Sequence, residues 1–394
     1  MHSDPVVIVG AARTPIGRFQ GELAQVAAPE LGAVAIAKAL ADAGVKATDV
    51  DEAVMGCVLP AGLGQAPARQ AARAAGLPLS VGCTTVNKMC GSGMKAAMLA
   101  HDLLVVGTSE VMVAGGMESM TNAPYLLNRT LGKRMGHRRV LDHMFLDGLE
   151  DAYDKGRLMG TFAEDTASAY QFTREAQDSF AIASLDRARR ASEDGTFARE
   201  IAPVRVTSRK GERMVERDEL PFRADPAKIP DLKPAFREGG TVTAANSSSI
   251  SDGGAALVMM RRSSAEKRGL KPLATVVGHA THAQEPAWFT TAPIGAIKRL
   301  FAKTGWSAAE ADLFEINEAF AVVTMAAMRD LGLPHEKVNP HGGACALGHP
   351  IGCSGARILV TLLNAMAKHD VRRGVASLCI GGGEATAMAL ERAT

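Results

Sequence analysis

The sequence has few aromatic residues and almost no net charge. Its 394 residues include 3 tyrosines, 2 tryptophans and 12 phenylalanines, against 40 glycines. Many glycines beside few aromatics indicate tight turns and close packing of helices on strands. The 44 basic and 42 acidic side chains give a formal net charge of +2, so overall charge favours neither nucleic acid nor a membrane surface as partner. An anionic ligand would have to be bound by a local group of side chains.

Metal-binding and secretory patterns are also missing. The six cysteines contain no Cys-x-x-Cys pair, and His279 and His282, the closest approach to a ligand pair, have no third ligand near them in the sequence, so we expect no metal site. A chain that is 47% hydrophobic does not need disulfides for a core, which favours a reducing compartment. Residues 1–12 do not resemble a secretory leader, and no run approaches the roughly 18 apolar residues of a membrane span. We therefore expect a cytoplasmic protein.

Short apolar runs alternate with segments of helical periodicity. Residues 6–9 and 52–55 are expected strands, and residues 29–43 and 70–75 are expected helices. This alternation predicts an α/β fold, and the length predicts two or three domains. Residues 10–17 lack the G-x-G-x-x-G spacing of a dinucleotide-binding loop, so we do not expect a nicotinamide or flavin nucleotide there.

One sequence pattern occurs twice. Residues 92–118 and residues 354–384 each begin with Ser-Gly, continue through a helical segment and an apolar strand, and end in Gly-Gly-x-Glu. The repetition predicts two similar halves. Residues from about 120 to 248 lack this regular pattern of strands and helices and are expected to form a loop-rich inserted domain. They carry a basic run that is either a solvated surface or a site for a polyphosphate ligand: Arg129, Lys133, Arg134, Arg138 and Arg139.

Cys90 is a candidate nucleophile. It precedes Gly91-Ser92-Gly93 and lies where the expected helix 94–104 begins. The unpaired N–H groups and the positive dipole end of a helix start favour a thiolate over a thiol. The alternative is that Cys90 is a small buried apolar residue, as most free cysteines are.

Three further segments place reactive groups at turns. Asn317 and Glu318 follow an apolar strand at a strand-to-helix junction that would face a cleft, although Asn317 could be a helix N-cap. His349 lies in residues 342–352, which are too glycine-rich for a helix or strand interior. Cys379 ends what we take as the final strand. The remaining cysteines are interpreted as packing residues, with the last two in glycine turns: Cys57, Cys83, Cys345 and Cys353.

Approximate twofold symmetry of the halves would bring these groups to one cleft. Two thiols and one imidazole would then face each other. Such a set suits acyl transfer with proton abstraction: one thiolate attacks, the imidazole takes its proton, and the other thiol moves a proton to or from carbon.

Six segments, taken together and in this order, resemble the thiolase family, and within it the acetyl-CoA acetyltransferases: AARTPIG (residues 11–17), NKMCGSG (87–93), GGMESM (115–120), NEAF (317–320), GHP (348–350) and CIGGG (379–383). The resemblance implies duplicated βαβαβαββ halves in a five-layered α/β/α/β/α arrangement. It divides the chain into a first half, 1–119 completed by 249–271, and a second half, 272–394. Residues 120–248 would bind coenzyme A and contribute tetramer contacts.

The resemblance also implies a role for each candidate residue. Cys90 would be acylated, His349 would activate it, and Cys379 would take a proton from the methyl group of acetyl-CoA. Asn317 would hold a water that forms, with His349, an oxyanion hole for the enolate, and the N–H groups of Cys90 and Gly381 would form a second hole for the tetrahedral intermediate. Four positions match residues that contact coenzyme A or line its pocket: Arg223, Phe236, Ser248 and Met159.

The implied activity is the reversible Claisen condensation of two acetyl-CoA to acetoacetyl-CoA and free coenzyme A, in fatty acid metabolism. No metal or resident cofactor is expected, because the coenzyme A thioesters are substrates. The alternatives are a degradative 3-ketoacyl-CoA thiolase of broader chain length, a non-catalytic acyl-CoA carrier, and a cysteine hydrolase, which would leave Cys379 without a role. The resemblance further implies a homotetramer, a dimer of dimers joined through a loop in residues 120–145.

Overall fold

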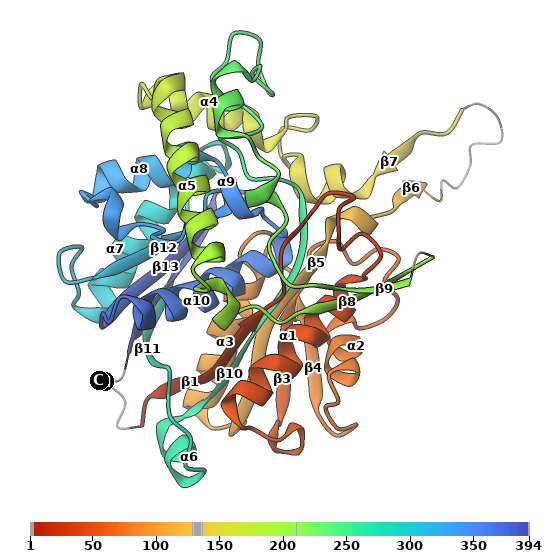
Figure 1. The fold of residues 1–394 in the computed structure, drawn as a ribbon, viewed down its shortest axis with the longest axis vertical. Helices are drawn as coiled ribbons and strands as arrows, with labels where there is room; N and C mark the ends of the chain where they lie inside the picture. The colour runs from red at the N-terminus through yellow and green to blue at the C-terminus, as the bar shows by residue number, and fades with distance from the viewer. Residues whose placement is uncertain (1–3, 128, 130–134, 136, 210, 393–394) are drawn as a thin grey trace.

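The computed structural model describes residues 4–127, 129, 135, 137–209 and 211–392 (Figure 1). Lys133 and Arg134 of the predicted basic run lie outside these residues. The two halves of the chain share one hydrogen-bonded sheet, in which the strand order is β12-β13-β14-β11-β1-β10-β5-β3-β4, with β2 (Gly17–Arg18) paired to β10.

The first half alternates strands and helices as the sequence predicts. β3 pairs in parallel with β4 on one side and with β5 on the other, and β10, which comes after the insertion, pairs antiparallel with both β1 and β5. The strand that follows the insertion therefore lies within the first half. The elements are β1 (Val6–Arg13), α1 (Ala28–Ala43), β3 (Glu52–Gly56), α2 (Pro67–Ala74), β4 (Gly82–Val86), α3 (Ser92–Val106), β5 (Val111–Ser119), β10 (Ser251–Arg261) and α6 (Arg262–Lys267).

Apart from a short helix in each half, α6 after β10 and α9 before α10, the second half repeats this order with one difference. Within the described residues, the place of β4 is taken only by an isolated parallel bridge between Phe314 and Val338. The halves join where β1 pairs antiparallel with β11, at Val7↔Thr275 and Ile8↔Ala274. The elements are β11 (Ala274–Ala283), α7 (Ala292–Thr304), β12 (Leu313–Ile316), α8 (Ala321–Leu331), α9 (Ala344–Leu347), α10 (Ile351–Lys368), β13 (Arg373–Ile380) and β14 (Glu384–Glu391).

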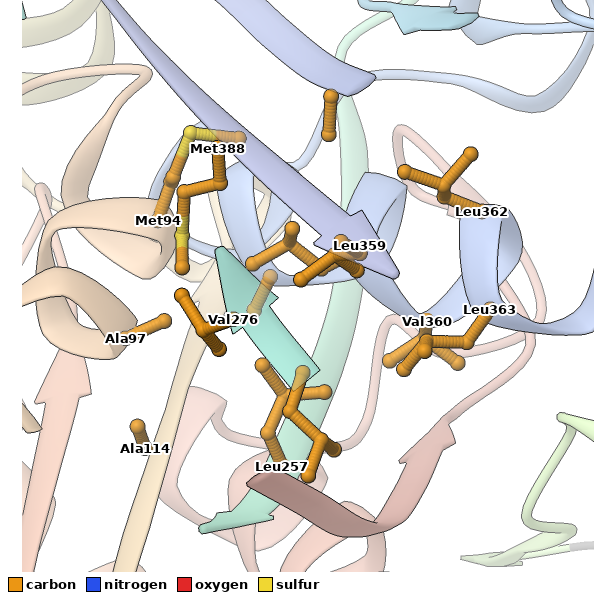
Figure 2. Close-up of a cluster of buried hydrophobic side chains, with 14 of the residues drawn as sticks. Met94, Ala97, Ala114, Leu257, Val276, Leu359, Val360, Leu362, Leu363 and Met388 are labelled. Carbon is orange, nitrogen blue, oxygen red and sulfur yellow. The ribbon is translucent and has the colours of Figure 1, made fainter. Parts of the chain in front are cut away.

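Helices α3 and α10 form the central layer, between the strands of the two halves. Met94 and Ala97 of α3 and Leu359 of α10 pack with strand residues from both halves, among them Leu257 and Met388 (Figure 2). Helices α1 and α2 cover the outer face of the first half, and α7 and α8 cover that of the second. The predicted five-layered α/β fold is confirmed. Each large apolar side chain buried in these layers contributes about 1.5–3 kcal/mol.

Two glycines let the central helices touch. A Cβ added at Gly355 of α10 would lie 2.3 Å from the backbone nitrogen of Met94, and one at Gly93 of α3 would lie 2.7 Å from that of Ala356. Any larger residue would push the helices apart. The packing of the two central helices therefore explains why the Ser-Gly pair occurs twice. The glycine of each pair is the point at which its helix contacts the other central helix.

The insertion is more regular than the loop-rich domain that we expected. Thr173 caps α5, where its hydroxyl accepts the N–H of Ala176. No helix in the described ranges combines the length and the apolar character needed to cross a membrane. The helices and strands of the insertion are β6 (Tyr125–Leu127), β7 (Val140–Asp142), α4 (Met159–Ala169), α5 (Arg174–Glu193), β8 (Val204–Ser208) and β9 (Gly211–Val215).

Candidate active site

Cys90 lies in a braced turn between β4 and α3. The amide oxygen of Asn87 accepts the N–H of Met89 at 2.9 Å, and Met89 takes a φ of 47°, in the left-handed region that side chains disfavour. Ser92 Oγ accepts the N–H of Lys88 at 2.8 Å and donates to the carbonyl of Met89 at 2.6 Å. These bonds hold the half-buried Cys90 next to the first turn of α3.

His349 occupies the corresponding place before α10. Its Nδ1 lies 2.6 Å from Ser354 Oγ, and that hydroxyl donates to the carbonyl of Pro350 at 3.0 Å. Because the serine proton is used in this way, Ser354 Oγ accepts a hydrogen bond from Nδ1–H, which leaves the lone pair of the ring on Nε2. Nε2 is buried and has no hydrogen-bond partner in the described part of the chain. The imidazole can therefore accept a proton at Nε2.

Burial keeps this imidazole neutral. Loss of solvent, helped by the positive charge of Arg357, lowers the pKa of His349 to about 3. Ser354 supports His349 as Ser92 supports the turn of Cys90, so the two copies of the repeat brace the two reactive groups. The sequence drew attention to both serines as a repeat but did not predict this role. The surrounding residues 342–352 are also more helical than expected, since they contain α9 and the start of α10.

Cys379 lies near the end of β13 and is fully buried. We expected Cys379 to end the final strand, but β13 is followed by another strand. The chain turns through Gly381–Gly383 into β14, with which β13 pairs antiparallel. Gly382 and Gly383 have φ values of 93° and 88°, a conformation that favours glycine. The glycine run therefore makes the tight turn that follows Cys379.

The turn of Cys90 packs against this glycine turn. The N–H of Gly381 lies near enough to the Cys90 sulfur to lower the pKa of this thiol, and an ion pair joins Lys88 to Glu384. Cys90, His349 and Gly381 line one cavity of about 360 Å³. The structure thus brings residues from both halves to one place.

Both thiols are protonated at neutral pH. Burial raises the pKa of the Cys90 thiol to about 11, against the opposing effect of the N–H groups of Gly381 and of Cys90 itself. The pKa of Cys379 lies well above its ordinary value, first because the group is buried and second because Cys90 is nearby. The prediction of a ready thiolate at the helix start is therefore wrong. Cys90 needs a base, and His349 is a neutral imidazole in the same cavity.

Asn317 lies between β12 and α8, and it is not the N-cap of α8, which is Phe320. Its side chain is buried; Oδ1 accepts a hydrogen bond from Arg357 at 3.3 Å. Nδ2 has no partner among the described residues. A buried amide without a partner is costly, so an unpaired Nδ2 indicates a position for water or ligand. Arg357 is also the charge that lowers the pKa of His349, which places Asn317 and His349 in one neighbourhood.

The predicted coenzyme A residues divide into two groups. Met159, Phe236 and Ser248 line the cavity together with Cys90. Arg223 does not line it; this residue is exposed and pairs with Glu219 at 2.9 Å. The sequence did not identify the apolar side chains that form much of the remaining wall: Phe145, Leu149, Leu158, Ile250, Phe289 and Phe320.

All six cysteines, each within the described residues, are free thiols. Cys57 and Cys353 are buried, and Cys83 and Cys345 are half-buried. Cys345 and Cys353 lie in α9 and α10 rather than in the glycine turns that we expected.

The sequence shows no third ligand near His279, but the fold brings two candidate ligands to it. Asp102 and His101 of α3 lie beside it. His282, the predicted companion, instead approaches the side chain of Gln284 at 2.9 Å.

The fold and the site define an enzyme that transfers acyl groups, and comparison with known proteins identifies its family. The family models of the thiolase N-terminal and C-terminal domains match residues 6–263 and 270–392. The chain belongs to the thiolase family and is an acyltransferase.

Similar proteins extend over almost the whole chain. An acetyl-CoA acetyltransferase of Arabidopsis thaliana is 51% identical, covering 98% of this chain and 96% of its own. One from Cupriavidus necator is 49% identical, covering 98% and 99%. Among solved structures, the Bacillus anthracis acetyl-CoA acetyltransferase has a TM-score of 0.96 at 41% identity, covering 99% of both chains. An Ascaris suum thiolase in complex with coenzyme A has a TM-score of 0.93 at 40% identity, covering 99% and 100%.

Proposed function

We propose that this protein is an acetyl-CoA C-acetyltransferase, which condenses two acetyl-CoA to acetoacetyl-CoA and coenzyme A and catalyses the reverse cleavage. The observation that carries the proposal is the cavity where Cys90 lies with a neutral imidazole whose Nε2 has no partner among the described residues, beside a second buried thiol, Cys379. Relatives at 51% and 49% identity bear this name.

The first step is acylation of Cys90. His349 Nε2 takes the thiol proton, and the resulting thiolate attacks the carbonyl carbon of acetyl-CoA. The N–H groups of Cys90 and Gly381 each lower the pKa of the Cys90 thiol, so they are close to where the carbonyl oxygen would become negative. Two fixed donors at that place stabilise the tetrahedral intermediate. Its collapse expels the thiolate of coenzyme A, which takes the proton of Cys379, and leaves an acetyl thioester on Cys90. Cys379 is then a thiolate, and His349 still carries the proton of Cys90.

The second step forms the carbon–carbon bond. Cys379, as a thiolate, removes a proton from the methyl group of a second acetyl-CoA. The burial that raises the pKa of this thiol also makes its thiolate a stronger base. The enolate oxygen would be stabilised by protonated His349 Nε2 and by a water on Asn317 Nδ2, both of them buried nitrogens that lack protein partners in the described residues. The enolate carbon attacks the acetyl group, and Cys90 leaves as a thiolate that takes its proton back from His349.

Product analysis with acetyl-CoA tests this proposal. We expect acetoacetyl-CoA from acetyl-CoA, cleavage of acetoacetyl-CoA by coenzyme A, and slower cleavage of long 3-ketoacyl-CoA. Cys90→Ala should abolish all three reactions. Cys83→Ala, which changes a half-buried thiol on β4, is the matched control and should keep them.

Each alternative function gives a different result. Faster turnover of long substrates would identify a degradative thiolase. Free acetate without acetoacetyl-CoA would identify a hydrolase, and no turnover would identify a carrier.

We further propose a homotetramer joined through the hairpin of β6 and β7, which projects from the body of the molecule (Figure 1). Tyr125, Leu127 and Val140 on this hairpin are 73%, 57% and 59% exposed, and exposed apolar side chains of this size favour a contact with another chain. Leu127→Glu together with Val140→Glu should convert tetramers to dimers in native mass spectrometry. An unchanged tetramer would reject the hairpin as the contact.

We also propose a cytoplasmic location and a part in fatty acid metabolism. A mouse relative at 48% identity is named as the cytosolic enzyme. The free thiols of this chain suit a reducing compartment. Cell fractionation followed by immunoblotting tests the location, and recovery in an organelle fraction would contradict it. Isotope tracing of fatty-acid carbon into acetoacetyl-CoA, with and without the protein, tests the metabolic role.

A further inference from the structure

Two histidines and an aspartate meet at the end of the central layer opposite to the start of α3. His101 and Asp102 belong to α3, and His279 belongs to β11. His279 Nε2 lies 2.9 Å from Asp102 Oδ1, and His101 Nδ1 lies 3.0 Å from the same oxygen. The two imidazole rings meet edge to face, with centroids 5.0 Å apart. One nitrogen or oxygen from each residue lies within 4.8 Å of the other two.

This set of donors suits a divalent transition metal. Zinc binds imidazole nitrogen and carboxylate oxygen at roughly 2.0–2.2 Å, so its tetrahedral ligands lie roughly 3.3 Å apart. The two contacts of Asp102, at 2.9 and 3.0 Å, are already close to that spacing. Small side-chain rotations would centre the three groups on one ion.

The exposed side chain of Asp102 leaves the cluster open to an ion from solvent. The side chains of His101 and His279 are only 16% and 15% exposed, whereas that of Asp102 is 54% exposed. Packed imidazoles on one side and an open carboxylate on the other leave a fourth position for water. Lys303 donates to the carbonyl of His279 at 3.2 Å, and the positive charge of this lysine weakens the attraction for a cation without occupying a ligand atom.

We propose that His101, Asp102 and His279 bind a divalent transition metal ion, for which Zn²⁺ is the best match. Ligation needs neutral imidazoles with protons on His101 Nε2 and His279 Nδ1, a change of tautomer that releases no net proton from neutral rings. The ion would connect a helix of the first half to a strand of the second. Ser92 and Asp102 are ten positions apart in α3, or about 15 Å, so the ion acts on stability and takes no part in the acyl transfer.

Cobalt spectroscopy and thermal unfolding of the full protein test this site. We expect one Co²⁺ per chain, with an absorption spectrum that lacks the sulfur-to-metal charge-transfer band of cysteine ligation. Zn²⁺ should raise the unfolding temperature. His101→Ala and His279→Ala should lose both effects. His282→Ala, on the same strand but outside the cluster, is the control and should keep them.

A second variant separates binding from folding. His279→Gln keeps a side chain that can hydrogen-bond to Asp102 but removes the imidazole, so a folded variant that no longer binds Co²⁺ supports the proposal. Binding by the His101 and His279 variants equal to that of the unchanged protein would overturn it. A charge-transfer band from sulfur would place the ion on cysteines and would also overturn it.

Discussion

Ser354→Ala removes the hydrogen-bond acceptor of His349 and leaves the cavity wall unchanged. Ser354 is fully buried and does not line the cavity that Cys90 shares with His349. Without its hydroxyl, Nδ1–H of His349 is buried without its partner at 2.6 Å. The imidazole then gains by rotating or changing tautomer, and either change moves the lone pair of Nε2 away from the Cys90 thiol.

The expected decrease in the rate of Cys90 acylation follows from the cost of leaving Nδ1–H of His349 without a hydrogen-bond acceptor. A buried hydrogen-bonding group without a partner costs about 1–3 kcal/mol, which corresponds to a roughly 5- to 150-fold slower acylation. The carbonyl of Pro350 loses the serine hydroxyl but keeps the N–H groups of Cys353 and Ser354, both at 2.9 Å. The loss of this third bond should therefore add little to the about 1–3 kcal/mol by which the orphaned Nδ1–H lowers the free energy of unfolding.

Rapid-quench measurement of Cys90 acetylation, with steady-state kcat and KM, tests this prediction. We expect acylation rate and kcat to fall together while KM for acetyl-CoA stays unchanged. Ser192→Ala is the control, because Ser192 makes the same kind of bond to a carbonyl four residues earlier, at 2.9 Å, away from the cavity. Wild-type acylation in Ser354→Ala would refute the role assigned to Ser354, and a change confined to KM would show that Ser354 acts on substrate binding instead.

Three other predictions concern the core and the nucleophile. Gly355→Ala should separate the central helices and destabilise the protein by about 3 kcal/mol in urea unfolding. The control Gly82→Ala, whose Cβ would meet nothing closer than 3.7 Å, should change the stability little. Equal effects of the two substitutions would contradict the close approach of α3 and α10. Asp218→Ala leaves the buried guanidinium of Arg13 without its bidentate partner and should cost about 3–5 kcal/mol, so wild-type stability would show that the pair is dispensable. Only the thiolate of Cys90 reacts with iodoacetamide, so a pKa of about 11 predicts that the alkylation rate rises tenfold per pH unit without a plateau below about pH 10. Peptide mapping measures the alkylation of Cys90. A plateau of the rate near neutral pH would contradict the raised pKa.

The elements around the site were predictable because their signals are local. Residues 29–43 carry helical periodicity, and α1 spans Ala28–Ala43. The repeated Ser-Gly pairs lie at the starts of α3 and α10. Reactive groups at the ends of strands were expected to share a cleft, and Cys90 and His349 do line one cavity.

Other features depend on contacts between distant residues. Much of the buried face of α5 consists of alanine and polar side chains, so its periodicity is weak in the sequence. The helix start at Cys90 predicted a low thiol pKa, but burial, which only the folded packing determines, raises it. Asp102 and His279 are 177 positions apart, and no local pattern joins them.

The most direct test of the central claim is the intact mass of Cys379→Ala after incubation with acetyl-CoA. If Cys90 and Cys379 divide acylation and proton abstraction in one site, the variant should accumulate one acetyl group on Cys90 and form no acetoacetyl-CoA. Condensation at the wild-type rate, or failure of a folded variant to become acetylated, would contradict that division of labour.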